Sequence, residues 1–446
     1  MMTSLASLGR RAGVAIGGLS VERIRLTGVG ATYLAVLTEP PYGTASVKSI
    51  SLAIAVLCAG TLASREWRAL RLRLTDLQLV LMAIAAFALA GSMYALDPWE
   101  SLRFFKGQLL QHLLVLGLLC GLARPEDHRH FLRVIAVVVA LLSVVGIVGF
   151  FTGTVAISDE VLGRRASSVF PSYDRAAIYV ARWSLALVAL GLCARGFRAA
   201  LGWWVGAAVC YFFVLLTYTR ATYFAVLAAV GVLLWWARGA RATVRAALAL
   251  ALAVAVSPLI LGKTGIPERF HSVAHIFNRP ETAGDRDLLL QSSVSMFLDH
   301  PVIGIGYGWY NFRRLYPLYR RPEARESVLY NCHNLYLQVL LEGGIVGAFP
   351  YFLLAGVLCG RLRAQYRQRR DSSRSPPDAR DVVLLAALGN LTVFALYSFT
   401  AVWFHAEGGL DFWVTVAMLE SVAAGGREVA QAEPEGAPRL REIRGA

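Results

Sequence analysis

His333 stands where a long polar segment gives way to an apolar one, so its side chain is expected at a membrane surface. The apolar run from Leu335 to about residue 360 is long enough for a membrane helix. On that helix Asn334, Gln338 and Glu342 recur every fourth residue and form a polar stripe. Such a stripe either joins helices through hydrogen bonds or marks a reaction or binding site, because ionisable groups inside membranes are usually functional. Both interpretations are open at this point.

The composition excludes a soluble globular domain. Of 446 residues, 57% are hydrophobic and only 16% are charged, which is typical of a chain that crosses a membrane many times. The net charge of +15 does not indicate nucleic-acid binding, because the basic residues form short clusters between apolar runs, as cytoplasmic anchors do. The chain is therefore predicted to be an all-α polytopic membrane protein.

About twelve apolar runs are expected to be transmembrane helices. They lie near 26–39, 47–62, 77–96, 109–122, 131–151, 176–193, 201–216, 221–236, 246–261, 335–360, 382–399 and 411–424. Arginines follow every second run, which predicts that both termini are cytoplasmic.

Four segments follow from this pattern. Residues 1–261 hold the first nine helices, 262–332 form a large periplasmic loop domain, and 333–424 hold the last three helices. The polar tail 425–446 is predicted to be cytoplasmic and disordered.

Arg220 is placed on the outer side by the same pattern. A single helix over residues 201–236 would be about 54 Å long, far longer than a bilayer core. The chain must therefore fold back between the runs 201–216 and 221–236. The turn at 217–223 then lies opposite the arginine-rich ends. An arginine there is either a snorkelling anchor or a functional residue, and its outer position favours function.

The loop 262–332 carries more cations than the positive-inside preference predicts for an outer loop. Nine basic residues, Arg286 among them, outnumber the acidic ones, which suggests an anionic ligand. Lipid head groups are the alternative partner for the arginines near Tyr316 and Tyr319. Residues 287–298 are predicted to form an amphipathic helix, and the glycine run 304–308 indicates either a phosphate-binding loop or a tight turn.

Two other groupings carry weaker signals. Cys332 beside His333 could form a nucleophilic dyad, but adjacent residues on a helix point about 100° apart. His405, Glu407 and Asp411 cluster in the last outer turn, although no second motif fixes a metal there.

The short segment 97–106 is predicted to be an amphipathic helix at the interface.

Three motifs in this order resemble the bacterial O-antigen ligase superfamily. They are Arg220 at an outer helix turn, Arg286 opening a helix that runs to His300-Pro301-Val302-Ile303-Gly304-Ile305-Gly306, and His333-Asn334 followed by Glu342-Gly343-Gly344-Ile345-Val346-Gly347. The motifs span about 217–347, and the helix pattern covers the whole chain. The sequence departs from the superfamily where Leu289 or Leu290 replaces an expected tryptophan, and where Ser172-Tyr173 follows Pro171 in place of the usual asparagine.

The resemblance implies a fold like that of GT-C-type glycosyltransferases and glycan transfer at the periplasmic face of the bacterial inner membrane. The donor would be a polysaccharide on undecaprenyl diphosphate and the acceptor the lipid A-core oligosaccharide, giving lipopolysaccharide. His333 would act as general base, and Arg220 and Arg286 would bind the donor diphosphate. Further candidates for substrate contact are Arg164, Arg175, Tyr218, Tyr307 and Asn334. No cofactor is implied, nothing in the sequence requires a metal, and direct displacement would invert the anomeric centre.

Other functions remain open from the sequence. O-antigen polymerases and protein O-oligosaccharyltransferases share these motifs. A non-enzymatic transporter of lipid-linked glycans would carry charged residues along a path through both leaflets, whereas here they concentrate on one side. Sequence alone therefore favours an enzyme over a transporter.

Overall fold

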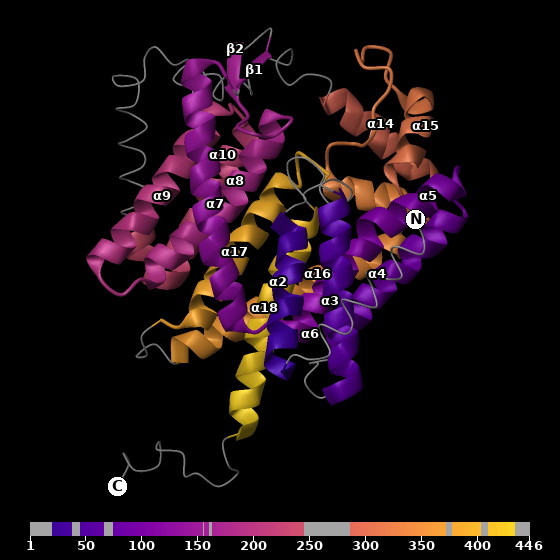
Figure 1. Cartoon of the computed structure of the whole chain (residues 1–446). Coiled ribbons are helices and arrows are strands. Elements are labelled where there is room, and N and C mark those ends of the chain that lie inside the picture. Colours follow the sequence, from indigo (N-terminus) through magenta and orange to yellow (C-terminus); the bar gives the residue numbers. More distant parts are fainter. Residues whose placement is uncertain are drawn as a thin grey trace, which may run out of the picture.

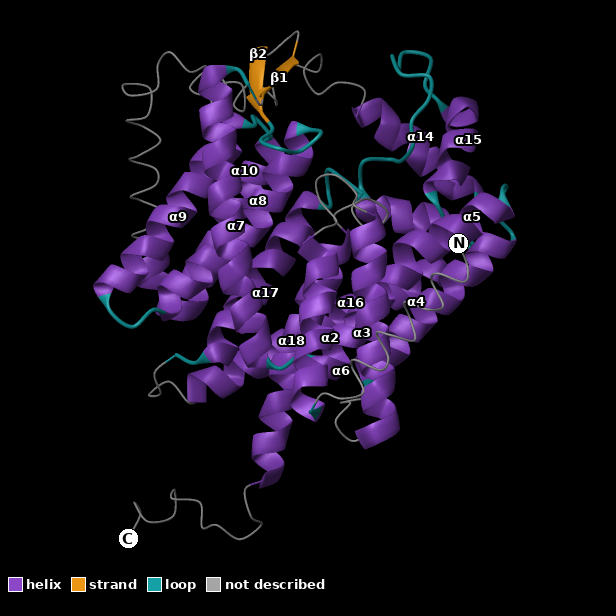
Figure 2. Cartoon of the chain, in the orientation of Figure 1, coloured by secondary structure: helices purple, strands orange, loops and turns teal. Residues whose placement is uncertain are grey.

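Long helices form most of the part of the chain that the structure describes, as the apolar runs predict (Figures 1 and 2). The computed structural model describes residues 20–37, 45–66, 75–154, 156–159, 163–244, 286–371, 377–402 and 409–432. The predicted run 246–261 lies outside these residues.

The helices follow the order of the predicted runs. In the first half they are α2 (Val21–Leu37), α3 (Ala45–Glu66), α4 (Asp76–Met93), α5 (Pro98–Phe104), the π-helical turn η2 (Phe105–Leu110), α6 (Gln111–Leu122) and α7 (Pro125–Thr152). In the second half they are α8 (Tyr173–Cys193), α9 (Phe197–Leu216), α10 (Arg220–Arg238), α14 (Arg286–Asp299), α15 (Trp309–Tyr319), α16 (Leu335–Asp371), α17 (Ala379–Tyr397) and α18 (Gly409–Ala432).

Among the described residues, nine helices are long and apolar enough to cross a membrane, against about twelve predicted. The difference has identifiable causes. α2 has only 17 residues, α18 is not among the nine, and 246–261 is not described. The amphipathic segments 97–106 and 287–298 are helical as predicted, in α5 and α14. α18 continues to Ala432, past the point where the sequence predicts the tail to begin.

A short β-hairpin that the sequence did not predict follows α7. β1 (Ala156–Asp159) pairs antiparallel with β2 (Gly163–Ala166), with Ala156 opposite Ala166. The hairpin lies at the ends of α7, α8 and α10, on the same side of the molecule as α14 and α15 (Figure 1).

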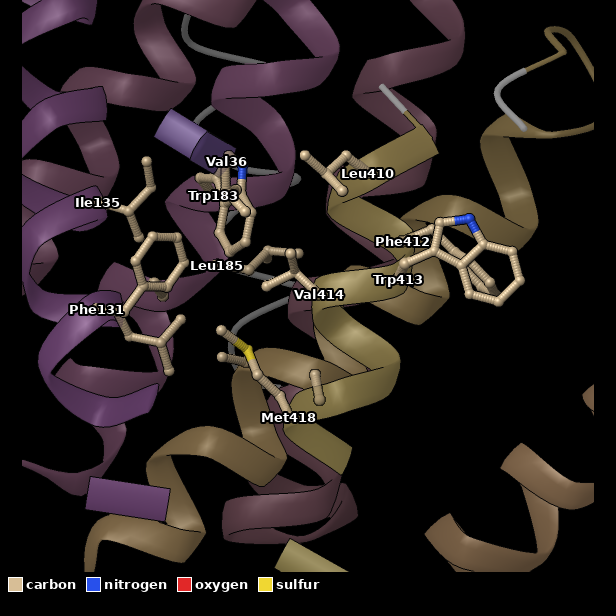
Figure 3. Packing of buried hydrophobic residues seen from close by; sticks show 14 of the residues in the cluster. Val36, Phe131, Ile135, Trp183, Leu185, Leu410, Phe412, Trp413, Val414 and Met418 are labelled. Carbon is tan, nitrogen blue, oxygen red and sulfur yellow. The ribbon is translucent and has the colours of Figure 1, made fainter. Parts of the chain in front are cut away.

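α8 lies at the centre of one half of the bundle. It packs against α7, α9, α10 and α17, and its residues from Ala176 to Cys193 are all buried. Trp183 of α8 faces Phe131 and Ile135 of α7 and the residues of α18 around Val414 (Figure 3). Such a helix must be apolar on every face. The exception is Arg182, whose guanidinium lies 3.7 Å from the carboxylate of the equally buried Asp411 on α18.

α16 is broken at Gly344, and a loop seals the break. Gly344 has φ +60° and ψ −165°, which are not helical values. The backbone N–H groups of Ile345 and Val346 donate to the carbonyls of Pro301 and Val302, at 2.8 and 3.1 Å. In the other direction, the N–H groups of Ile305 and Gly306 donate to the carbonyls of Leu341 and Glu342, at 2.8 and 3.1 Å.

The glycine run 304–308 allows its backbone to approach the break of α16 closely. A Cβ at Gly304 or Gly344 would overlap the backbone of the other segment, and both residues have positive φ. The N–H of Tyr307 donates to the carbonyl of Gly91 on α4, at 3.2 Å. Since the amides of residues 305–307 are occupied by protein carbonyls, this geometry favours the tight turn over the phosphate-binding loop.

Gly344→Ala is expected to lower the free energy of unfolding by about 1–3 kcal/mol, because the new methyl group overlaps the carbonyl of Val302 and the positive φ is retained. The measurement is thermal unfolding of the purified protein in detergent. Gly347→Ala is the control, because a Cβ there meets no atom within 4 Å. Equal melting temperatures for the two variants would contradict this account of the break.

Candidate functional site

His333 lies in the connection that leads into α16. The N–H of Leu335, the first residue of α16, donates to the carbonyl of Ser398 just beyond α17, at 2.8 Å. The hydroxyl of Tyr336 donates to the carbonyl of Ala395, at 2.7 Å. These two bonds fix the start of α16 against the end of α17 and so hold the residue that precedes them.

The backbone of His333 is in the left-handed region, with φ +51°. This conformation is uncommon for residues other than glycine, although asparagine, aspartate and histidine adopt it more often than the rest, and it often marks functional sites. The flanking asparagines stabilise it. The N–H of His333 donates to Oδ1 of Asn331 at 3.0 Å, and Oδ1 of Asn334 accepts from the N–H of Leu337 at 3.1 Å. Asn334 is thus the N-cap of α16.

The polar stripe below His333 supports the backbone. Oε1 of Gln338 accepts from the N–H of Cys332 at 3.2 Å, and its Nε2 donates to Oε1 of Glu342 at 2.7 Å. Both side chains are buried. Of the two interpretations of the stripe, this geometry favours helix support.

The imidazole of His333 is solvent-accessible but partly enclosed by protein. Its pKa is lowered from the ordinary 6.5, first by desolvation and second by the positive charge of Arg286. A neutral imidazole therefore predominates at pH 7, and this is the form that accepts a proton.

Arg286 is the first residue of α14 and is exposed. Besides His333, it acts electrostatically on Asp174 of α8 and on Tyr397, the last residue of α17. The ends of α8, α16 and α17 are therefore within electrostatic reach of its guanidinium at the start of α14. Within the described chain Arg286 forms no ion pair, so its donors are available to a ligand.

Asp174 links this group to the turn between α9 and α10. Its Oδ1 accepts from the hydroxyl of Thr219 at 3.1 Å, and Arg165 of β2 also acts on its charge. The guanidinium of Arg165 lies over the ring of Tyr173, 4.0 Å from the centroid. We call His333, Arg286, Asp174 and Arg165 the junction site.

Arg220 begins α10, directly after Thr219, and is half-buried. Tyr218, two residues earlier, is buried with φ +56°. The turn is held by Tyr223, whose hydroxyl donates to the carbonyl of Leu215 at 2.6 Å. Thr219 thus brings this turn, and with it the backbone of Arg220, to the junction site.

The other predicted residues have different surroundings. Arg164 lies in β2 opposite Ser158, and Arg175 is exposed in the first turn of α8. Tyr307 is buried, with its ring 5.7 Å from that of Phe104. The contacts of Tyr307 with α4 and α5 explain its position without a ligand.

The weaker groupings also acquire structural explanations. Cys332 is buried, its Sγ donates to the carbonyl of Asn334 at 3.0 Å, and burial raises its pKa to about 12, so it is a thiol rather than a nucleophile. Asp411 pairs with Arg182, while His405 and Glu407 lie outside the described residues. Ser172, at the departure from the superfamily pattern, caps α8 by accepting from the N–H of Arg175.

Sequence reasoning did not single out Asp174 or Arg165. Both are ordinary charged residues in or beside the connection between α7 and α8, and no spacing relates them to residues over a hundred positions away. The one local signal is Ser172, whose capping ability marks the start of α8 and so puts Asp174 at a helix end.

Taken together, the fold and the junction site define a multi-pass α-helical membrane protein with cationic and titratable groups gathered where its helices end. Residues 205–352 match the family model described as O-antigen ligase. This segment, about a third of the chain, is similar to the O-antigen ligase family, whose members are ligases and polymerases of the glycosyltransferase kind. The match includes Arg220, Arg286 and His333. No curated protein matches the chain.

The pKa of His333 is expected to lie below 6.5 and to rise in Arg286→Gln, because removing a neighbouring positive charge favours the imidazolium form. The measurement is a pH titration by NMR of protein labelled with ¹³C in histidine, with His333→Asn identifying the signal. Arg313→Gln is the matched control, since Arg313 lies over the ring of Tyr330. An unchanged pKa in Arg286→Gln would show that the two groups are not coupled.

Proposed function

We propose that this protein transfers a polysaccharide from undecaprenyl diphosphate to a hydroxyl of the lipid A-core oligosaccharide, at the periplasmic face of the bacterial inner membrane. The match of residues 205–352 to the O-antigen ligase family supports a lipid-linked glycan as donor. The observation that carries the proposed chemistry is Arg286 within electrostatic reach of a neutral His333. A base for a hydroxyl and a cation for a phosphate are the two groups that this reaction requires.

The donor already contains its leaving group, because the sugar is joined to a diphosphate. In the transfer step the acceptor oxygen bonds to the anomeric carbon, and the bond from that carbon to the diphosphate oxygen breaks with its electron pair. The acceptor proton passes to the imidazole of His333. Attack opposite the leaving group inverts the anomeric centre.

Arg286 is affected by both charge changes of this step. Desolvation is the first reason that the pKa of His333 is lowered, and the positive charge of Arg286, which disfavours protonation of the imidazole, is the second. The departing diphosphate gains negative charge in the same step, and a guanidinium can bind it through two parallel hydrogen bonds. The growing attraction to the diphosphate therefore offsets the growing repulsion from the imidazolium.

Arg220 is the second proposed ligand of the diphosphate. Its backbone is fixed near the site by the bond between Thr219 and Asp174. Within the described residues it forms no ion pair, so its charge is available to an anion. Two guanidiniums suit a ligand with two adjacent phosphates better than one does.

The polymerase is the second candidate, because it uses the same donor and differs only in its acceptor. The deciding experiment gives purified protein a glycan on undecaprenyl diphosphate together with either lipid A-core or a second donor molecule. A ligase attaches the glycan to lipid A-core, and we expect this product by gel shift and mass spectrometry. Growth of the donor chain alone would identify a polymerase, transfer to a protein would identify an O-oligosaccharyltransferase, and movement across the bilayer without transfer would identify a transporter.

His333→Gly is expected to lower the transfer rate by about 10²- to 10⁴-fold, the usual contribution of a general base, while the protein stays folded. Glycine adopts a positive φ without strain, so the variant relieves the backbone while it removes the imidazole. The measurements are initial transfer rate and melting temperature. His300→Asn, which removes an exposed imidazole at the end of α14, is the control.

Arg220→Ala and Arg286→Ala complete this series. Each is expected to reduce transfer while leaving the melting temperature close to that of the wild type. Full transfer in all three variants would show that the reaction takes place elsewhere.

A further inference from the structure

Asp174 is a carboxylate in a place proposed for an anion. It lies in the first turn of α8, outside the segment 205–352 that matches the family. Arg286 and Arg165 both act on its charge. A negative group there competes with a diphosphate for the same guanidinium, so on electrostatic grounds alone it weakens donor binding.

The contacts of Asp174 suggest what offsets this disadvantage. Its Oδ1 accepts from Thr219 at 3.1 Å, and Thr219 is the residue next to Arg220. The same turn contains Tyr218 with φ +56°, a conformation that persists only where surrounding contacts hold it. The bond to Asp174 is one of the contacts that hold it.

The side chain of Arg286 is exposed and needs a partner that restricts its orientation. As the exposed first residue of α14, Arg286 has a long side chain with many rotamers and an entropic cost for adopting one of them. Asp174 is well suited to restrict it, because α8 is buried from Ala176 onward and cannot shift easily. Tyr397, on which both Asp174 and Arg286 act, lies in the same small region.

We propose that Asp174 is a positioning residue of the transfer site, which fixes the turn of Arg220 through Thr219 and orients Arg286 beside His333 through its charge. This inference rests on the proposed function for its effect on catalysis. Its effect on diphosphate binding can be measured independently of transfer.

The test compares Asp174→Asn, Thr219→Val and the double variant with wild-type protein. Asp174→Asn keeps the shape of the side chain, removes its charge and weakens the bond from Thr219, because a neutral amide oxygen is a weaker acceptor than a carboxylate oxygen. Thr219→Val removes the hydrogen bond to Asp174, together with the bond that the hydroxyl of Thr219 accepts from that of Thr217 at 3.3 Å. Asp287→Asn is the matched control, because Asp287 is an exposed carboxylate next to Arg286 that forms no hydrogen bond or ion pair with Asp174, Arg165 or His333 within the described residues.

Three quantities are measured: kcat, the KM for the donor, and the Kd for undecaprenyl diphosphate itself. In Asp174→Asn, kcat is expected to fall about ten- to a hundredfold, since small misplacements of reacting groups have effects of this size, and product binding is expected to weaken. Asp287→Asn should leave kcat unchanged and bind the product equally or more tightly. Thr219→Val should also lower kcat, and the double variant should lose less than the product of the two single effects.

The opposite results are equally defined. If Asp174→Asn binds undecaprenyl diphosphate more tightly with kcat unchanged, the carboxylate is only a neighbouring charge and the proposal is wrong. Fully multiplicative effects in the double variant would also overturn it. If wild-type protein binds the diphosphate but transfers no glycan, the proposed function fails, while the binding comparison still decides the role of Asp174. If Asp174→Asn does not fold, the comparison of kcat and product binding between Thr219→Val and the control Asp287→Asn decides whether Asp174 positions the site.

Discussion

The break of α16 at Gly344 is the constraint on which the rest of the site depends. A break inside a membrane helix leaves N–H and C=O groups without helical partners, and in an apolar surrounding they must find others. Here residues 301–306 supply them through four backbone hydrogen bonds. The same residues connect α14 to α15, so the bonds that satisfy the broken helix also fix the outer helices to it. His333, at the start of α16, and Arg286, at the start of α14, therefore belong to one connected framework.

The framework also explains why a strained histidine is tolerated. His333 is held in the left-handed region by bonds on both sides: Asn331 before it, and after it the cap Asn334 and the tie between Leu335 and Ser398. A residue other than glycine in the left-handed region lowers the free energy of unfolding by about 1–3 kcal/mol. Several hydrogen bonds to the backbone, at about 1 kcal/mol each, are enough to offset this loss. The side chain then projects from a fixed backbone, which suits a group that must meet a substrate hydroxyl at a set distance.

Sequence predicted the helices well because long apolar runs and arginine-rich connections are local signals. It also predicted the turn before Arg220 and the helices α5 and α14. It left two interpretations of the stripe that contains Gln338 and Glu342, of which the structure favours helix support. It did not predict the β-hairpin, because 156–166 lacks a turn signal, nor the break at Gly344, because the glycine that permits it resembles the packing glycines of ordinary membrane helices. Asp174 could not be assigned to the site, since its neighbours Thr219 and Arg286 are brought to it only by the packing of α8, α10 and α17. The roles of His333, Arg220 and Arg286 came from a resemblance and from general chemistry, and they await the measurements described above.

The enclosure of α8 has a mechanical consequence. A helix surrounded by α7, α9, α10 and α17 cannot tilt without repacking all of them, so Asp174 is attached to the stationary half of the molecule. α14 is different, because Leu290, Val294 and Leu298 leave one of its faces uncovered by the described chain. The junction site thus lies between the enclosed helix α8 and the less enclosed helix α14. Opening the site to a bulky substrate would require displacing α14 and α15 rather than the central bundle.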